Sequence, residues 1–408
     1  MLSTGRTKVG GEEEAAAGSS PRAATAPAAV HAPAGSSASA PSSGGGGAGP
    51  GAPPAGAGGG AGRPPARRRG RSSWWRAERL LPHGLHVFAF IPLVALALLL
   101  GALVWKALPA IRYNGTGFFT RSVWSLGNLY VLPVKTGGVA HPPEAAYGAL
   151  SLVEGTLVSS AIAIVLAVPV AVGTALVVVE KLPPRLSTGI GFCLEVLAGV
   201  PSVVFGLWGW FTLGPFLAHD VAPIWADHIF NHLPDVPVLR FFRGPTGGGT
   251  GLFVAGVVLA IMILPIVAAT SRDLLRQVPR GTVEGALALG MTDAESLRAV
   301  NMPWVRSGVI GATVLGLGRA LGETIAVAMV GGSLVAAPVH SLYPDFGTIA
   351  ATIVNTLDSA LTDVSGLATD TLAELALVLL VITLVANVGA RLLVRRVATT
   401  ALPVGRGI

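Results

Sequence analysis

The chain has 408 residues, of which 51% are hydrophobic and only 12% are charged, about half the charged share of an ordinary soluble domain. This composition excludes a soluble globular protein and indicates a membrane protein, and the single cysteine, Cys193, excludes a disulfide framework within one chain. The formal net charge is +7, but the basic residues are distributed along the flanks of apolar segments, which argues against a nucleic-acid-binding protein.

The N-terminal segment, residues 1–72, is made largely of Gly, Ala and Pro, as in GGGGAGPGAPPAGAGGGAG at 44–62. A segment without large apolar side chains cannot bury enough surface to offset the entropy of the chain. It also lacks the apolar stretch of a secretory signal near its start. We therefore expect a disordered cytoplasmic tail.

A basic interfacial flank follows at 73–84. Arginines and tryptophans gather in it and just before it: Arg67, Arg68, Arg69, Arg71, Trp74, Trp75, Arg76 and Arg79. Basic residues beside a membrane span set its orientation, and indole rings favour the membrane interface. The pattern fits an ordinary flank that sets topology, and it also fits an anchor to anionic lipids.

Six apolar segments follow, each near the ~20 residues that a helix needs to cross a bilayer. They lie at about 85–108, 149–179, 187–217, 251–271, 307–331 and 371–390. The second and third are overlong, which indicates tilt or an extension beyond the lipid. The sequence therefore predicts an all-α polytopic membrane protein with about six transmembrane helices over 85–395, followed by a cytoplasmic tail at 396–408.

The Lys and Arg residues predict how these helices are oriented. One set of connections is basic: Lys181, Arg185, Arg272, Arg276, Arg280, Arg298 and Arg306, to which the C-terminal tail adds Arg391, Arg395, Arg396 and Arg406. On the opposite side, the last connection, 332–370, has no Lys or Arg. We predict that both termini are cytoplasmic and that the connections 109–148, 218–250 and 332–370 face outward.

The stretch EGALALGMTDAESLRAVNMP, residues 284–303, carries three acids and one base between two long apolar segments. We expect Thr282 to cap one short helix and Asp293 to cap a second, because their side chains can accept from the first amides of a helix. Gly290 separates the two helices, and Pro303 ends the second. Helical spacing gives the second helix a small apolar face for a cytoplasmic partner, formed by Ala294, Leu297 and Val300. A plain solvated loop is the alternative.

This stretch resembles the EAA loop of ABC importer permeases, which in that family inserts into a groove of the ATPase subunit. The matching positions are Glu284, Ala286, Gly290, Val300 and Pro303, whereas Gly285 and Met302 depart mildly from the pattern. The resemblance implies that residues 280–303 form a coupling loop. No Gly-x-x-x-x-Gly-Lys phosphate-binding loop occurs in the sequence, so an energising ATPase would be a separate subunit.

Three other stretches resemble the PstC-type permease of the phosphate-specific importer. They are EVLAGVPSVVFGLWGW at 195–210, PTGGGTGLFVAGVVLAIMILPIVA at 245–268 and GRALGETIAVAMVGG at 318–332. The resemblance covers about 85–395 and implies the type I architecture of ABC importer permeases. It also implies three partners, which are an ATP-binding subunit dimer, a second permease of the PstA type and an extracytoplasmic phosphate-binding protein.

Charged residues inside the spans are candidates for a substrate path, because a charge at the centre of a bilayer is costly. Arg319 and Glu323 lie four residues apart in the fifth predicted span, where they would share one helix face. An arginine suits an oxyanion, since its planar fork binds two oxygens at once. The alternative is a structural ion pair, either between these two residues or between Arg319 and Glu195 of the third span.

Gly199, Pro201 and Gly206 interrupt the third predicted span. Pro and Gly are common in membrane helices, so a passive kink is one interpretation. The other is a broken helix whose freed backbone amides face the substrate path.

Three histidines, His219, His228 and His232, lie in the outward connection 218–250. The spacing of the last two suits a metal, but a polar loop in contact with water explains them as well. We predict no metal site, no cofactor and no catalytic residue.

These observations lead to one interpretation and two alternatives. We expect a permease subunit of an ATP-driven ABC importer that moves inorganic phosphate across the cytoplasmic membrane of a bacterium. A permease for another oxyanion, such as molybdate, sulfate or phosphonate, would share its architecture. An ion-coupled secondary transporter without an ATPase is the alternative from another class, and inverted repeats would favour it.

Overall fold

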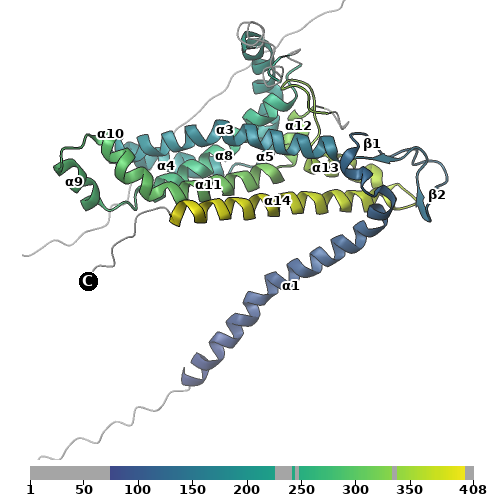
Figure 1. Ribbon diagram of the computed structural model, residues 1–408, viewed down its shortest axis with the longest axis horizontal. Helices are drawn as coiled ribbons and strands as arrows, with labels where there is room; N and C mark the ends of the chain where they lie inside the picture. Colours follow the sequence, from purple (N-terminus) through teal and green to yellow (C-terminus); the bar gives the residue numbers. More distant parts are fainter. Residues whose placement is uncertain (1–73, 226–240, 244–247, 333–337, 400–408) are drawn as a thin grey trace, which may run out of the picture. The chain divides into compact units, whose positions relative to one another are not determined.

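The computed structural model describes residues 74–225, 241–243, 248–332 and 338–399 (Figure 1). The expected disordered tail and the positions of His228 and His232 lie outside the described residues. The first helices and the strands are α1 (Trp74–Asn114), α2 (Gly117–Thr120), β1 (Trp124–Ser125), β2 (Val134–Thr136), β3 (Val139–His141), β4 (Ala146–Tyr147), α3 (Leu150–Glu180) and α4 (Pro184–Ala198). The remaining elements are α5 (Ser202–Trp208), η1 (Gly209–Leu213), α6 (Gly214–Phe216), η2 (Leu217–Val221), α8 (Leu252–Leu275), α9 (Arg280–Ala288), α10 (Asp293–Ser296), η5 (Leu297–Asn301), α11 (Met302–Gly322), α12 (Ile325–Val330), α13 (Ile349–Leu361) and α14 (Leu367–Thr399).

The described residues contain four helices that are long and apolar enough to cross a membrane, namely α1, α3, α8 and α14. A fifth candidate is the pair formed by α4 and the helix Ser202–Val221, which are bent by 91° at the break between them. The fifth predicted span, 307–331, is divided into α11 and α12 rather than forming one helix. The prediction of a helical polytopic membrane protein is confirmed, with four to five uninterrupted or bent spans in the described part.

Small residues bring α3 and α8 together at the centre of the helical bundle. One line along α3 carries an alanine at every fourth position: Ala163, Ala167, Ala171 and Ala175, all of them buried. Such residues let two helix backbones approach closely, and this close packing favours helix association in lipid. On α8, a Cβ at Gly256 would lie only 2.5 Å from Cγ2 of Ile162 in α3.

The C-terminal end of α1 packs against α14 in a second apolar cluster. Within this contact, Asn114 Nδ2 donates a hydrogen bond of 2.7 Å to Oε2 of the buried Glu374. The segment after α1 forms two short antiparallel sheets, β1–β4 and β2–β3, so the expected outward connection 109–148 is partly ordered as strands. Trp124 of β1 and Tyr147 of β4 belong to the same cluster, which ties these strands to the helices.

The N-terminal end of α8 is completed by a distant part of the chain. The N–H groups of Gly251, Leu252 and Phe253 donate to the carbonyls of Val330, Pro344 and Leu342, at 2.8, 3.3 and 2.8 Å respectively. The first amides of a helix have no partner within the helix, so these carbonyls take that place. The same connection, predicted as loop 332–370, also contains the short helix α13.

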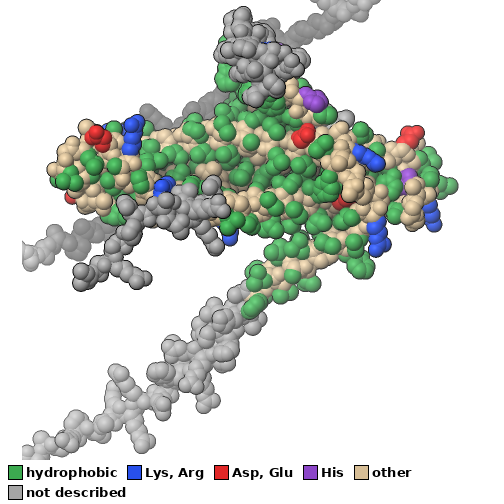
Figure 2. Space-filling model, in the orientation of Figure 1, with side chains coloured by type: hydrophobic (Ala, Val, Ile, Leu, Met, Phe, Trp, Pro, Cys, Tyr) green, Lys and Arg blue, Asp and Glu red, His purple; other side chains and the backbone are tan. Residues whose placement is uncertain are grey.

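The surface of this helical part is mostly apolar along its length. Figure 2 shows hydrophobic side chains over most of the described surface in view, while most of the visible charged side chains lie toward the two ends of the long helices. This distribution suits helices whose middle parts lie in lipid and whose ends meet water.

Candidate functional site

The predicted coupling loop, residues 280–303 and called the coupling segment from here on, begins with α9, which starts at Arg280 after Pro279. Pro279 occupies the cap position, so the expectation that Thr282 caps this helix is wrong. Pro279 has an extended ψ of 123° and gives no side-chain cap, and the N–H of Thr282 already donates to its carbonyl at 3.1 Å, so α9 starts before Thr282. Glu284 consequently lies beyond the first turn, where it is exposed.

Gly290 ends α9 with a hydrogen-bonded reversal. Its φ of +88° lies in the left-handed region, which is strained for residues with a Cβ. The N–H of Gly290 donates to the carbonyl of Leu287 at 2.9 Å, and the N–H of Met291 donates to the carbonyl of Ala286 at 3.3 Å. These two bonds are the Schellman pattern, which satisfies the last carbonyls of a helix. Gly290 thus separates the two helices, as the sequence predicted.

Thr292 caps the second helix through a reciprocal pair of hydrogen bonds with Glu295. The N–H of Glu295 donates to Thr292 Oγ1 at 3.3 Å, and the N–H of Thr292 donates to Glu295 Oε2 at 2.8 Å. The Thr292 hydroxyl also donates to Glu295 Oε2, at 2.9 Å. The bonds from the backbone N–H and the hydroxyl of Thr292 stabilise the ionised carboxylate, which lowers the pKa of Glu295. The expected cap Asp293 is instead the first helical residue, where it forms an exposed ion pair of 3.5 Å with Lys181.

Pro303 does not end the second helix, contrary to expectation. The chain continues from α10 through the π-helical turn η5 into α11, and Pro303 lies in the first turn of α11. A proline cannot donate to the carbonyl four residues before it, and its ring crowds that carbonyl. A wider π turn just before Pro303 accommodates both effects.

Apolar residues of the coupling segment divide between an inner and an outer face. Val283 and Val300 pack against a buried cluster at the ends of α3 and α8, so Val300 faces the permease itself rather than a partner. Ala286 is also buried, at 7% exposure. The outer apolar surface is formed by other residues, Leu287, Leu289 and Met291, of which Leu289 is 84% exposed.

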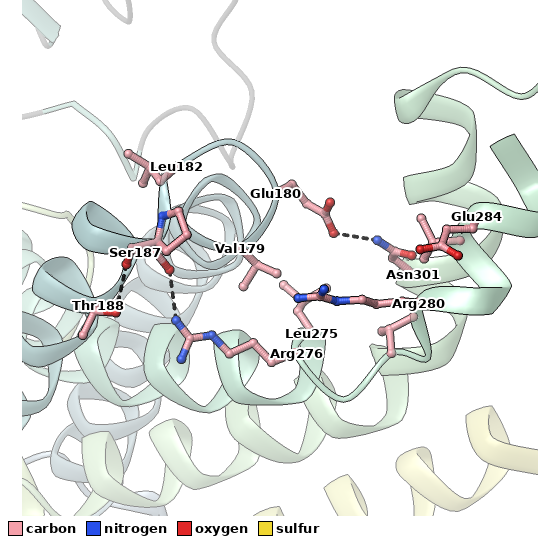
Figure 3. Close-up of a pocket in the computed structure, with 13 residues that line it drawn as sticks. Val179, Glu180, Leu182, Ser187, Thr188, Leu275, Arg276, Arg280, Glu284 and Asn301 are labelled. Carbon is pink, nitrogen blue, oxygen red and sulfur yellow. Dashed lines mark hydrogen bonds between the residues drawn. The ribbon is translucent and has the colours of Figure 1, made fainter. Parts of the chain in front are cut away.

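A cavity of about 610 Å³ lies behind the coupling segment, where it meets the ends of α3, α4 and α8 (Figure 3). Asn301 Nδ2 donates a hydrogen bond of 2.7 Å to Glu180 Oε1, which joins the end of η5 to the end of α3. Arg276 Nη2 donates to Ser187 Oγ at 3.0 Å, which joins α8 to α4. Figure 3 shows Glu284 and Arg280 of α9 beside this cavity. The coupling segment is therefore tied directly to the end of α3, and the end of α8 is tied in turn to α4.

Arg319 and Glu323 do not share a helix face. Arg319 lies in the last turn of α11, but Glu323 follows the end of that helix with ψ of 129°, an extended conformation. Glu323 Oε1 instead accepts a long hydrogen bond of 3.4 Å from the N–H of Ala326, at the start of α12. A carboxylate is favourable there, because the N-terminus of a helix carries partial positive charge. Within the described residues, Arg319 forms no ion pair, and its buried Nε has no hydrogen-bond partner.

Glu195 pairs with Arg272 rather than with Arg319. Arg272 Nη2 lies 2.8 Å from Glu195 Oε1 and also 2.8 Å from Oδ1 of Asp273. The ion pair connects α4 to α8, and Gly191 leaves the room that the guanidinium occupies. The suggested pairing of Glu195 with Arg319 is therefore wrong, because a nearer arginine takes the carboxylate.

The third predicted span is broken rather than gently kinked. Gly199 follows α4, Pro201 precedes α5, and the two helices meet at 91°. The N–H groups of Gly199 and Val200 bond back to carbonyls of α4, at 3.1 and 3.2 Å. The amides left open by this geometry are therefore those of the first turn of α5, as at any helix start.

Gly206 is not part of this break. It lies inside α5, where a Cβ would be 2.9 Å from Cα of Ala326 and 2.8 Å from Sδ of Met329 in α12. Its role in the structure is to let α5 and α12 approach each other.

Several polar contacts of this region were missed from the sequence. The pattern Thr-x-x-Glu at 292–295 is the signature of a capping box and could have identified the true cap. Arg272 was counted only as a basic flank, and no short-range pattern pairs it with Glu195. Asn387 and Arg391 of α14 lie in a groove with Arg319, a proximity that sequence spacing does not reveal.

Comparison with known proteins gives a consistent family. Residues 163–399 match the family model "Binding-protein-dependent transport system inner membrane component". The chain is 58% identical over 320 residues to the phosphate transport system permease protein PstC 1 of Mycobacterium tuberculosis, covering 78% of this chain and 94% of that protein. It is 34% identical to the phosphate transport system permease protein PstC of Haemophilus influenzae, covering 79% of this chain and 95% of that protein.

Among solved structures, the chain is similar to a bacterial alginate ABC transporter in complex with an alginate-bound periplasmic protein. The TM-score is 0.47 at 13% sequence identity, over 81% of this chain and 96% of that chain.

Proposed function

The chain belongs to the inner membrane component family of binding-protein-dependent transport systems and within it to the PstC-type permeases, and from this premise we propose that it moves inorganic phosphate into a bacterial cell. The observation that carries the proposal is its high identity to a relative named as a phosphate permease, over nearly the whole length of that relative. The chain is thus a transport permease subunit and not an enzyme.

Membership of this family implies work with an ATP-binding subunit and a substrate-binding protein. The finer assembly is our proposal, and it consists of an ATPase dimer, a second permease of the PstA type and an extracytoplasmic phosphate-binding protein. The coupling segment supports an ATPase dock. Its two helix ends are fixed by Gly290 and by Thr292 with Glu295, and they hold the exposed Leu289 outward.

Glu284, Ala286, Gly290, Val300 and Pro303 act in this dock in different ways. The exposed Glu284 is available to the ATPase. Ala286 and Val300 are buried or packed inward, and Pro303 lies at the start of α11, so these residues hold the shape of the segment instead of touching the partner.

The protein is a multi-pass membrane protein, and we place both of its termini in the cytoplasm. The coupling segment lies at one end of α3 and α8, and the small sheets lie at the other end of the long helices (Figure 1). Lys181, Arg185 and Arg276 lie at the coupling end. An excess of basic residues marks the cytoplasmic side of a bacterial membrane protein.

Arg319 is the residue of this chain that we assign to the phosphate path. Arg319 has no carboxylate partner among the residues that the structure describes, and such an intramembrane arginine retains a positive charge for an oxyanion. Glu323 shapes the start of α12 beside it. We also propose that the first amides of α5, left open by the bend at Gly199 and Pro201, face this path. Glu195 acts as a structural partner of Arg272.

Uptake of radiolabelled phosphate tests this proposal. The chain is produced with its ATPase, second permease and binding protein in a bacterium that lacks its own high-affinity phosphate uptake. We expect uptake that depends on all four components and that excess unlabelled phosphate abolishes. Molybdate, sulfate and phosphonate serve as competitors, and stronger competition by one of them than by phosphate would reassign the substrate. Uptake that persists without the ATPase would contradict the importer assignment.

A further inference from the structure

A groove of about 840 Å³ lies between α8, α11 and α14. Leu, Val and Ile side chains form most of its walls, and three polar residues interrupt them: Arg319 of α11, and Asn387 and Arg391 of α14. Asn387 and Arg391 are four residues apart and share one face of α14. The groove thus has an apolar wall with polar groups that converge from two helices.

The two helices approach each other closely at this point. Gly318 precedes Arg319 and has no side chain, so the amide of Asn387 lies against the backbone of α11. A Cβ built on Gly318 would be 3.7 Å from Asn387 Oδ1. The position of Asn387 beside Arg319 is therefore set by helix packing.

The charge of this groove is not balanced by any residue that the structure describes. Two guanidinium groups line it, and none of its lining residues is acidic. In the described residues neither arginine forms an ion pair, and the buried Nε of Arg319 lacks a hydrogen-bond partner. Buried polar groups normally have partners, and an uncompensated charge near lipid is costly. An anionic ligand would satisfy both requirements.

We propose that this groove binds a phosphate group, with Arg319 and Arg391 contacting its oxygens and Asn387 Nδ2 donating a further hydrogen bond. Guanidinium groups favour phosphate because their paired N–H groups match two of its oxygens. The phosphate group belongs either to inorganic phosphate in transit, which rests on the function proposed above, or to the headgroup of an anionic lipid. Asn387 and Arg391 thereby become ligands of the same site as Arg319.

The test uses the whole complex, reconstituted in vesicles that contain phosphatidylglycerol. The variants are Arg391→Gln and Asn387→Leu, with Arg391→Lys to restore the charge. Arg185→Gln is the matched control, since Arg185 is an exposed arginine outside the groove. One measurement is the amount of phosphate imported per ATP hydrolysed, and the other is the number of phosphatidylglycerol molecules retained on the purified complex by native mass spectrometry.

The two sources of phosphate give different results. If the groove holds phosphate in transit, Arg391→Gln lowers phosphate imported per ATP by about tenfold, the size expected for one charge-assisted contact, and Arg391→Lys recovers part of it. If the groove holds lipid, Arg391→Gln and Asn387→Leu each remove about one phosphatidylglycerol per chain and leave that ratio unchanged.

The proposal would be overturned if Arg391→Gln and Asn387→Leu both assemble correctly and both match the Arg185→Gln control within about twofold. This applies to the phosphate imported per ATP and to the phosphatidylglycerol retained. A wild-type complex that imports no phosphate would contradict the proposed function alone, because lipid retention still decides whether the groove binds a phosphate group.

Discussion

Arg272 and Glu195 join α8 to α4 through an ion pair whose Nη2 and Oε1 atoms are 2.8 Å apart, one turn before the chain bends at Gly199. The two side chains differ in their surroundings, since Arg272 is 6% exposed and Glu195 is 60% exposed. The pair therefore consists of a buried cation held by an acid whose side chain lies at the surface of the chain. Removing the cation and removing the acid should have unequal effects.

We expect Arg272→Gln to lower the stability of the purified complex by about 2 kcal/mol, because it removes charge-assisted bonds to both Glu195 and Asp273. Glu195→Gln should cost less than about 1 kcal/mol, since its oxygen still accepts and exposed ion pairs contribute little. The measurement is the thermal unfolding midpoint of the complex. A larger loss for Glu195→Gln than for Arg272→Gln would contradict the assignment of Arg272 as the buried member that holds the contact.

Gly290→Asp should yield a chain that enters the membrane but does not co-purify with its ATPase. The φ of +88° costs a residue with a Cβ about 1 kcal/mol or more, and the reversal that holds Leu289 outward would be lost. Gly285→Ala is the control, because Gly285 lies within α9 with open space around its Cα. Co-purification of the ATPase with Gly290→Asp at the yield of Gly285→Ala would count against the dock.

Thr292→Ala should destabilise the start of α10 by about 1 kcal/mol, the usual effect of losing a helix cap, whereas Thr292→Ser should retain the cap. Hydrogen exchange of the amides at 293–297 measures this change. If Thr292→Ala leaves the protection of these amides as in Thr292→Ser, the capping contact has no energetic role.

The same cap should depend on pH. The pKa of Glu295 is lower in the folded chain than its ordinary value of 4.5. The stability that the ionised carboxylate gives to the helix cap is therefore fully present above that value. It is lost as the pH falls through the lowered pKa, when the carboxylate binds a proton. Amide protection at 293–297, corrected for intrinsic exchange, should therefore fall below pH 4.5 in the wild type and stay flat in Glu295→Gln, which has no carboxylate to protonate.

Gly206→Val should destabilise the complex, because its side chain would meet the backbone of α12 at Ala326. We expect a loss of about 1–3 kcal/mol, typical of overpacking in a close helix contact. Gly173→Ala in α3, with open space around Gly173, is the matched control. Equal unfolding midpoints for these two variants would show that α5 and α12 do not need this close approach.

Arg319→Gln should abolish phosphate uptake while the complex still assembles, because the guanidinium has no ion pair in the described residues to lose. Arg319→Lys should retain part of the uptake, since it keeps the charge but not the planar fork. Uptake is measured per assembled complex. If the double variant Arg319→Gln with Glu323→Gln transports at the wild-type rate, Arg319 has no role in the path.

Hydropathy, together with the glycine at a helix end, was sufficient to predict much of this fold. The apolar segments predicted α1, α3, α8 and α14. A membrane span must form its backbone hydrogen bonds within one helix, and it must therefore be long and apolar. The reversal at Gly290 was also predictable, since glycine is the residue that adopts a left-handed angle without strain.

The sequence was less informative where a contact depends on helices far apart in the chain. Glu195 and Arg272 are separated by 77 positions, and only the packing of α4 on α8 brings them together. The prediction that Arg319 and Glu323 share a helix face was wrong for a local reason. Helix α11 ends at Gly322, and Glu323 instead accepts a hydrogen bond from the first turn of α12. In the same way, the sequence predicted Thr282 and Asp293 as helix caps, but Pro279 and Thr292 occupy the cap positions.

The hydrogen bonds at the N-terminal end of α8 have a consequence for how this protein is made. Gly251, Leu252 and Phe253 precede their respective acceptors, Val330, Pro344 and Leu342, by 79, 92 and 89 residues. During synthesis, the ribosome therefore delivers α8 to the membrane well before the carbonyls that complete it exist. Until then, water or the insertion machinery must satisfy those amides, because hydrocarbon cannot. Helix α8 is thus synthesised before α12, but its first amides obtain their hydrogen-bond partners only after α12 has been made.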